Sequence, residues 1–169
     1  MEPRLVATPE AEVRRRSWVL LAFRLPREPS TPRIALWRKL KRLGAVQLLD
    51  GLVALPLDRH NREQLEWLAD SVVDAGGEAT IWIGKLATAA QERQLVERMR
   101  ARASADYLAL IGDAAAVRAQ PPGQRRRSLE RLRRELRRIR LRDHFGPDER
   151  EQAQQALDEL AAVVDEVVA

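Results

Sequence analysis

The spacing of apolar residues divides the first half of the chain into short strands and amphipathic helices. Residues 17–25 form a continuous apolar, β-prone run, which predicts a buried central strand. A helix follows, with Thr31 as its N-cap and Pro32 at its first helical position. Its apolar positions recur every three or four residues and predict a buried stripe of Ile34, Trp37, Leu40 and Leu43.

Two further strands and a second helix come next. Residues 45–49 and 52–57 are predicted strands, and the Asp50-Gly51 pair between them favours a type I′ hairpin. Residues 61–75 then predict a helix. Its inward-facing side chains are expected to be Leu65, Leu68, Val72 and Val73.

A last predicted strand, residues 79–86, completes the order β-α-β-β-α-β. This order predicts an α+β fold in which a ferredoxin-like antiparallel sheet carries both helices on one face. We expect residues 1–13 to form a mobile tail, residues 14–86 the ferredoxin-like domain and residues 87–169 a helical C-terminal extension.

The extension is predicted to contain helices at 87–102 and 105–118, a break at 120–123, a basic helix at 124–142 and an acidic terminal helix at 147–168. The basic helix has a heptad-like seam of Leu129, Leu132, Leu136 and Ile139, and the acidic helix has a stripe of Ala153, Leu157, Leu160, Val164 and Val167. These seams can pair as an antiparallel hairpin within one chain or between two chains. A homodimer through the seams or through the sheet edge is the expected assembly.

Charge is distributed unevenly along the chain. The composition, 45% hydrophobic and 33% charged, is that of an ordinary folded protein. The net charge is +5, yet residues 124–142 alone contain ten arginines and two glutamates, so the rest of the chain is net negative. Such segregation indicates an anionic partner for the basic helix. Three interpretations stay open: duplex DNA bound through its phosphates, an acidic protein, and a merely solvated face.

The DNA interpretation draws its contacts from two predicted helices. Arginine, which dominates the second of them, makes bidentate contacts with phosphates or carboxylates. The candidate DNA-binding residues are Arg33, Arg38, Lys39, Lys41 and Arg42 in the first helix, and Arg125, Arg126, Arg127, Arg131, Arg133, Arg134, Arg137, Arg138, Arg140 and Arg142 in the basic helix.

The connection from the first strand to the first helix is a candidate oxyanion site. Arg24 and Arg27 lie close to a predicted helix N-terminus, where free N–H groups and the helix dipole favour an anion. Ser30 and Thr31 would complete the site. The alternative is an ordinary connection whose arginines pair with Glu28 and solvent.

The sequence gives little support for other chemistry. It contains no cysteine, which excludes disulfides and Cys-based metal sites. His60 and His144 lie far apart, so we expect no metal, no cofactor and no enzymatic activity. Residues 14–21 superficially resemble a twin-arginine export signal, but Arg24 interrupts the apolar run. We therefore expect a cytoplasmic protein that does not contact membrane.

The tryptophans are expected to be core or interface residues rather than platforms for stacking bases, because all fall within the predicted sheet domain. They are Trp18, Trp37, Trp67 and Trp82. Trp18 is the expected exception, exposed beside three consecutive arginines.

A family resemblance rests on three segments. LLAFRLPREPSTPRIALWRKLKRLGAVQLLDG, EQLEWLADSVVDAGGEATIW and the later IRLRDHFG resemble the N-terminal domain of the ChrB chromate-resistance regulatory family. The resemblance implies control of chromate-responsive genes by DNA binding, by sensing chromate or another oxyanion, or by both. More distantly, the sheet domain resembles the phenylacetate-pathway repressors and the small CRISPR adaptation nuclease. The acid that such a nuclease uses for metal binding is absent from residues 19–24.

Overall fold

The computed structural model describes residues 15–166, and the predicted tail at 1–13 lies outside them. The chain divides into two compact units. The first, called the sheet unit, contains the residues up to Leu40 and Ala45–Leu95; the second, called the bundle unit, contains Lys41–Gly44 and the residues from Val96 onward. The protein is therefore α+β, with its strands confined to the first unit.

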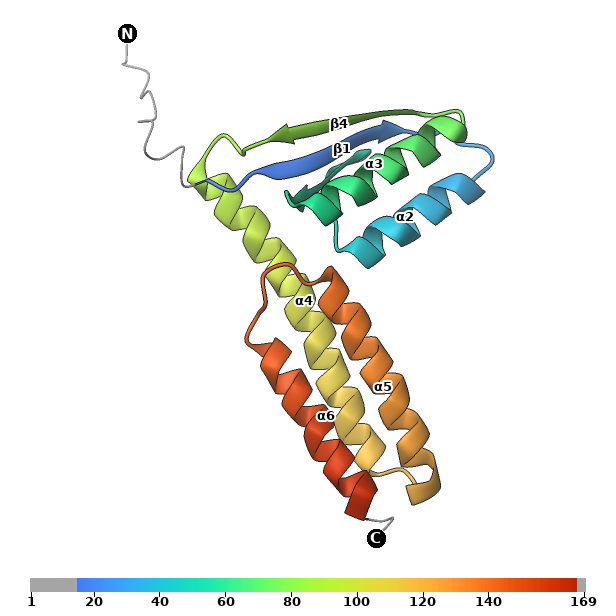
Figure 1. Ribbon diagram of the computed structural model, residues 1–169, viewed down its shortest axis with the longest axis vertical. Coiled ribbons are helices and arrows are strands. Elements are labelled where there is room, and N and C mark those ends of the chain that lie inside the picture. Colours follow the sequence, from blue (N-terminus) through green and yellow to red (C-terminus); the bar gives the residue numbers. More distant parts are fainter. Residues whose placement is uncertain (1–14, 167–169) are drawn as a thin grey trace. The chain divides into compact units, whose positions relative to one another are not determined.

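The sheet unit has the predicted order of strands and helices (Figure 1). The elements are β1 (Trp18–Arg24), α2 (Thr31–Leu43), β2 (Val46–Leu49), β3 (Leu52–Pro56), α3 (Arg59–Asp74) and β4 (Glu78–Gly84). The strands form an antiparallel four-stranded sheet in the order β2-β3-β1-β4. β1 therefore lies inside the sheet, and β2 and β4 are its two edges.

Both helices of the sheet unit pack on one face of the sheet. Val19 and Leu21 of β1 lie on this face and are fully buried. Phe23, two residues further on, meets Trp37 of α2 edge-to-face, with ring centroids 5.8 Å apart. Because side chains alternate along a strand, the even-numbered residues of β1 point to the opposite face.

The structure corrects several sequence-based burial predictions in this unit. Ile34 and Val73 were expected inside, but they are 54% and 56% exposed. α2 packs instead through Leu36 and Leu40, which lie on a neighbouring stripe of the helix. Trp18 was expected outside but is only 1% exposed, whereas Leu20 and Ala22, on the same face of β1, are only partly buried.

Two tryptophans that were expected to be core or interface residues are exposed in the single chain. Trp67 on α3 is 63% exposed, and Trp82 on the edge strand β4 is 61% exposed. Burial of an aromatic residue on a sheet depends on whether its strand is central or at an edge. The sequence pattern of a single strand does not contain that information.

The β2–β3 hairpin is confirmed, but its predicted turn type is wrong. Leu49 pairs with Leu52 across the two-residue turn. A type I′ turn needs positive φ at both central residues. Gly51 has φ +78°, whereas no residue other than glycine in the described chain has positive φ, so Asp50 does not fit. A register shift between Gln47 and Leu49 accompanies this turn.

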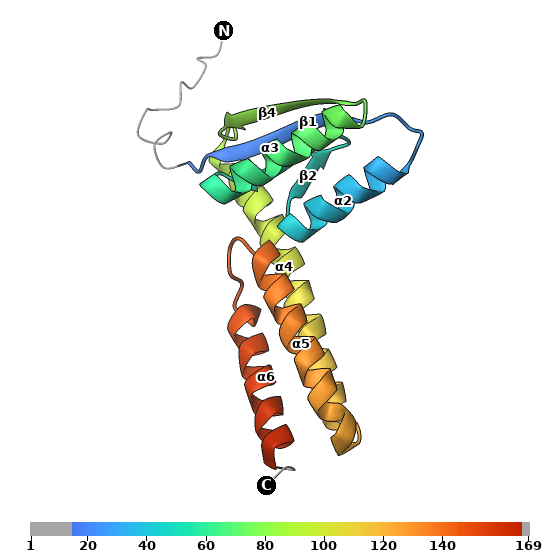
Figure 2. The ribbon, with the colours of Figure 1, turned by 45° about the vertical axis from the view of Figure 1, so that its right-hand side comes forward.

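The bundle unit packs three helices around one core (Figure 2). They are α4 (Ala89–Arg118, whose first residues belong to the sheet unit), α5 (Pro122–Arg142) and α6 (Glu149–Glu166), with α5 antiparallel to α4 and α6. The predicted seams of α5 and α6 face each other within the chain as far as Val164, and α4 completes the core; the predicted seam residue Val167 lies outside the described residues. The contribution of α4 is Ala103, Tyr107, Leu110, Ala114 and Val117.

Two helix breaks predicted from the sequence differ from those in the structure. The expected gap between 102 and 105 is absent, because Ala103 continues the three-to-four spacing of the buried residues and α4 runs through it. The break at 120–123 is shorter than expected, because Pro122 and Gly123 already belong to the first turn of α5. Proline is tolerated there since the first N–H groups of a helix have no partner inside it.

Candidate nucleic-acid interface

The buried seam of α5 determines where its arginines point. Leu129, Leu132, Leu136 and Ile139 face the bundle core and are at most 4% exposed. With 3.6 residues per turn, the residues on the opposite side of the helix must face solvent. The ten arginines of α5 are distributed over the flanks and this outer side.

Six of the ten arginines are held by other groups of the chain. Arg125 donates to the carbonyl oxygen of Gln120 over 2.8 Å, and Arg140 donates to Oε1 of Gln154 over 2.8 Å. Arg131, Arg133, Arg138 and Arg142 pair with carboxylates. The positive charges of these four are therefore partly neutralised before any partner arrives.

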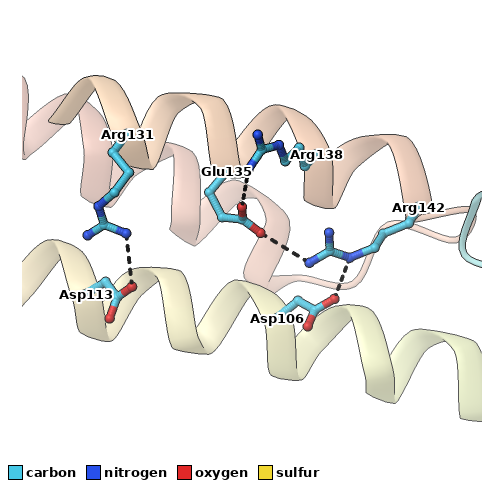
Figure 3. A network of polar contacts seen from close by, with 6 residues as sticks. All are labelled: Asp106, Asp113, Arg131, Glu135, Arg138 and Arg142. Atoms are coloured by element: carbon cyan, nitrogen blue, oxygen red, sulfur yellow. Dashed lines mark hydrogen bonds and ion pairs between the residues drawn. The ribbon is translucent and has the colours of Figure 1, made fainter. Parts of the chain in front are cut away.

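The carboxylate pairs join α5 to α4 (Figure 3). Arg142 lies between Asp106 of α4, at 2.8 Å, and Glu135 of its own helix, at 3.4 Å. Its side chain is 22% exposed, so this is the least solvated of the arginine pairs on α5. Arg131 reaches Asp113 of α4 over 4.0 Å, and Arg138 reaches Glu135 over 3.5 Å.

The remaining four arginines form the outer arginine face, which consists of Arg126, Arg127, Arg134 and Arg137. All four are exposed, and within residues 15–166 none of them makes a hydrogen bond or ion pair. Helical geometry places them within a sector of about 100°, and about 16 Å separates the first from the last along the axis. That length corresponds to roughly five base pairs of duplex DNA at 3.4 Å each.

The predicted basic residues of α2 are mostly on its surface. Arg38, Lys39, Lys41 and Arg42 are exposed. Arg33 is half-buried, and its guanidinium donates to the carbonyl oxygens of Leu25 and Pro26, at 3.3 Å each. Arg33 thus closes the connection before α2, which leaves it less available to a partner than the other four.

The four predicted oxyanion-site residues are separated by their contacts. Arg24 ends β1 and pairs with Glu78 of β4 over 2.7 Å, with both side chains largely exposed. The carbonyl oxygen of Ser30 accepts the first hydrogen bond of α2, from the N–H of Ile34, so Ser30 is the residue before the helix and Thr31 lies within it. In the described residues no hydrogen bond or ion pair joins Arg24, Arg27, Ser30 and Thr31 to one another.

Sequence reasoning missed a polar cluster at the end of α5. Asp143, whose side chain is 1% exposed, accepts a 2.8 Å hydrogen bond from the hydroxyl of Tyr107. It also accepts from the N–H groups of Phe145 and Gly146 and lies 3.9 Å from the guanidinium of Arg150. The sequence feature that could have indicated this cluster is RDHFG, in which an aspartate directly follows the last arginine of the helix.

No constellation for metal-dependent chemistry is present in the described residues. No group of three or more histidines, cysteines or carboxylates there is able to hold a metal ion. Across residues 15–166, each helix is also too short or too polar to cross a membrane.

Comparison with known proteins identifies relatives for the first part of the chain. The family model described as "Protein ChrB, N-terminal" matches residues 33–120. Protein ChrB of Cupriavidus metallidurans is 32% identical over 91 residues, which cover 54% of this chain and 28% of that protein. No solved structure gives a significant match. The family match ends before α5, so it includes α2 but not the outer arginine face. Because that match spans half of the sequence, the resemblance expected from the sequence is confirmed, and this chain belongs to the ChrB N-terminal family.

Proposed function

We propose that the chain is a transcriptional regulatory protein of the chromate-resistance type and that it binds duplex DNA mainly through phosphate contacts of the outer arginine face. The observation that carries this proposal is the division of the α5 arginines into six that are held and four that are exposed without a partner. A solvated helix face needs no such concentration of unpaired positive charge. Phosphates are the partner that such a face fits, because their binding releases condensed counterions.

The chemistry of this face favours backbone contacts over base recognition. Arg126, Arg127, Arg134 and Arg137 present guanidinium groups without neighbouring asparagine or glutamine side chains on the same face. Contacts to phosphate position a protein on the duplex but carry no sequence information by themselves. Preference for an operator would therefore come from DNA shape or from another part of the regulator.

Two further assignments accompany this proposal. We assign the sheet unit to the ferredoxin-like arrangement, supported by its element order and by the strand order β2-β3-β1-β4. A DNA-binding role also requires a cytoplasmic location. The aligned residues cover 28% of the ChrB relative, so the activity of that whole protein is a proposal for this chain.

The proposal also includes oxyanion sensing at the turn before α2, with fewer ligands than the sequence suggested. Arg27 would be the main ligand, because Arg24 is already paired with Glu78. Chromate would then compete with other tetrahedral oxyanions of similar charge. Isothermal titration calorimetry of the chain with chromate and with sulfate tests this point; the absence of a binding heat with both anions would remove the site from the proposal.

The DNA-binding proposal is tested by fluorescence anisotropy with a labelled duplex across a series of salt concentrations. Two matched triple variants remove the same charge from the same helix. One replaces Arg126, Arg134 and Arg137 with glutamine; the other replaces the paired residues Arg131, Arg133 and Arg138 with glutamine. We expect the first to reduce the slope of log K against log salt by about 2.7, since each phosphate contact contributes about 0.9. The second is expected to change the slope much less.

Equal effects of the two triple variants would contradict the assignment to the outer arginine face, because only net charge would then matter. If the unmodified chain does not bind duplex DNA at physiological salt, the DNA proposal is wrong. Binding of an acidic protein that depends on the same arginines would then favour the interaction-module interpretation.

A further inference from the structure

The two edges of the sheet differ in how well they are protected against pairing with another strand. β2 is four residues long and has an irregular register with β3. β4 has seven residues, each in regular register with β1, and contains no proline. Short or bulged edges resist pairing, whereas a long regular edge offers a row of unpaired N–H and C=O groups. In residues 15–166 no strand pairs with the outer side of β4.

Large apolar side chains are exposed on both sides of the β4 edge. Trp82 and Ile83 are 61% and 48% exposed and point to opposite faces of the sheet. Val73 of α3 is 56% exposed. It lies on the flank of α3 away from α2, because Ser71, on the other flank, lines a small cavity with α2 residues such as Ala35 and Leu36. This flank of α3 therefore faces the β4 edge.

The other dimer surface expected from the sequence, the seams of α5 and α6, is already buried within the chain. The seams of α5 and α6, including Leu132 and Leu160, are buried against each other and against Tyr107 of α4. A second chain could reach them only if the bundle opened. The long β4 edge is thus the better surface for a second copy of the chain.

Two-fold symmetry restricts how two β4 edges can pair. If the strands are antiparallel, the axis must be perpendicular to the sheet, so the helices of both copies lie on the same side. One residue must then lie opposite its own copy. Only Ile81, the centre of Glu78–Gly84, allows all seven residues to pair. We propose that two chains form a homodimer through antiparallel β4 strands centred on Ile81, which joins their sheets into one eight-stranded sheet.

The side chains of β4 fit this register. Glu78 would lie opposite Gly84 of the second copy, which has no side chain, so the pair of Glu78 with Arg24 could remain at each end of the ladder. Trp82 would lie opposite Thr80 of the second copy and diagonal to its Trp82, within reach for aromatic side chains. Val73 and Ile83 of both copies would be covered on the helical side of the joined sheet.

The absence of cysteine from the sequence permits a direct test of the register. In the full chain, Ile81→Cys would place two sulfur atoms opposite each other on the symmetry axis. Opposite residues in antiparallel strands have Cα atoms about 4.5–5.5 Å apart, which is within the range for a disulfide. Thr80→Cys, one residue away, is the matched control, because its own copy lies diagonally at about 7–8 Å. We expect the first variant to cross-link quantitatively on mild oxidation and the second to cross-link weakly.

A second measurement is independent of cross-linking. Analytical ultracentrifugation of the full chain should show a dimer, and Trp82→Lys should convert it to a monomer with an unchanged circular dichroism spectrum. Trp67→Lys, which alters an equally exposed tryptophan away from the edge, should remain dimeric. A monomeric unmodified chain, a dimer that survives Trp82→Lys, or stronger cross-linking at position 80 than at 81 would each overturn the proposal. None of these readouts uses DNA, so failure of the dimer and failure of DNA binding are distinguishable.

Discussion

The hydroxyl of Tyr107 on α4 donates a 2.8 Å hydrogen bond to Oδ2 of Asp143, the residue that directly follows α5. Oδ1 of the same carboxylate accepts from two backbone N–H groups, those of Phe145 and Gly146. One buried side chain therefore attaches the end of the arginine helix to α4 and fixes the turn toward α6. The position of the outer arginine face depends on this attachment.

Replacing Asp143 with alanine should destabilise the bundle by about 3 kcal/mol. The change removes three hydrogen bonds, each of which contributes about 1 kcal/mol net, and it leaves the Tyr107 hydroxyl buried without a partner. Urea unfolding followed by far-ultraviolet circular dichroism measures the effect. Asp165→Ala, at an exposed position on α6, is the control and should change stability by less than about 0.5 kcal/mol. Equal effects would mean that the cluster does not stabilise the bundle.

The stability of the bundle should fall at high pH. Burial raises the pKa of the Tyr107 hydroxyl well above its ordinary value, and the hydrogen bond and negative charge of Asp143 raise it further. The unfolded chain loses this proton near pH 10, whereas the folded chain retains it. The free energy of unfolding should therefore decrease above about pH 10, by up to about 1.4 kcal/mol per pH unit. Below pH 10 the contribution of this group is fully present.

Tyr107→Phe should lack this part of the pH dependence, which separates it from the titration of lysines. The ionisation can also be followed directly by phenolate absorbance, since Tyr107 is the single tyrosine of the sequence. Ionisation near pH 10 while the circular dichroism spectrum remains native would show that the hydroxyl is not held as described.

Arg142 and Arg138 share a partner, Glu135, but their replacement by alanine should change the free energy of unfolding by different amounts. Arg142→Ala removes contacts to both Asp106 and Glu135 from a site that is 22% exposed, and we expect a loss of about 1–2 kcal/mol. Arg138→Ala removes one pair at a site that is 70% exposed, and we expect a loss below about 0.5 kcal/mol. Thermal unfolding at low and high salt measures both. Similar losses would indicate that the Arg142–Asp106 pair between α4 and α5 does not stabilise the bundle.

Two glycines of the sheet unit provide a matched pair of backbone substitutions. Gly51 and Gly76 have φ +78° and +80°, so alanine is strained by roughly 1–2 kcal/mol at either position. At Gly51 a Cβ would also lie 2.3 Å from the carbonyl oxygen of Phe23, whereas Gly76 has open space around it. Gly51→Ala should therefore be the more destabilising of the two by at least about 1 kcal/mol. Tryptophan fluorescence reports the result, because all four tryptophans lie in the sheet unit. The reverse order would contradict the described turn.

The sequence was sufficient to predict the features that depend on the spacing of neighbouring residues. The strands and helices of the sheet unit begin and end within about two residues of their predicted bounds. The seam residues Leu129, Leu132, Leu136 and Ile139 are buried as their spacing predicted. These features follow from the periods of strands and helices, which are properties of neighbouring residues. The hairpin at Asp50-Gly51 was predictable for the same reason, although its turn type was not.

Only the tertiary structure decided which surfaces are available. The sequence offered ten arginines in one helix; Gln120, Glu130 and Glu135, which are close in sequence, hold three of them. Asp106 and Asp113 from α4 and Gln154 from α6 hold three more, which leaves four without partners among the described residues. Likewise, Trp82 is exposed on the edge strand β4, whereas Trp18 is buried on β1, which lies inside the sheet. The contacts of α5 with α4 and α6 and the place of each strand in the sheet join residues that are distant in the sequence. The pattern of apolar positions thus determined the elements, and their packing determined the arginine face and the open sheet edge.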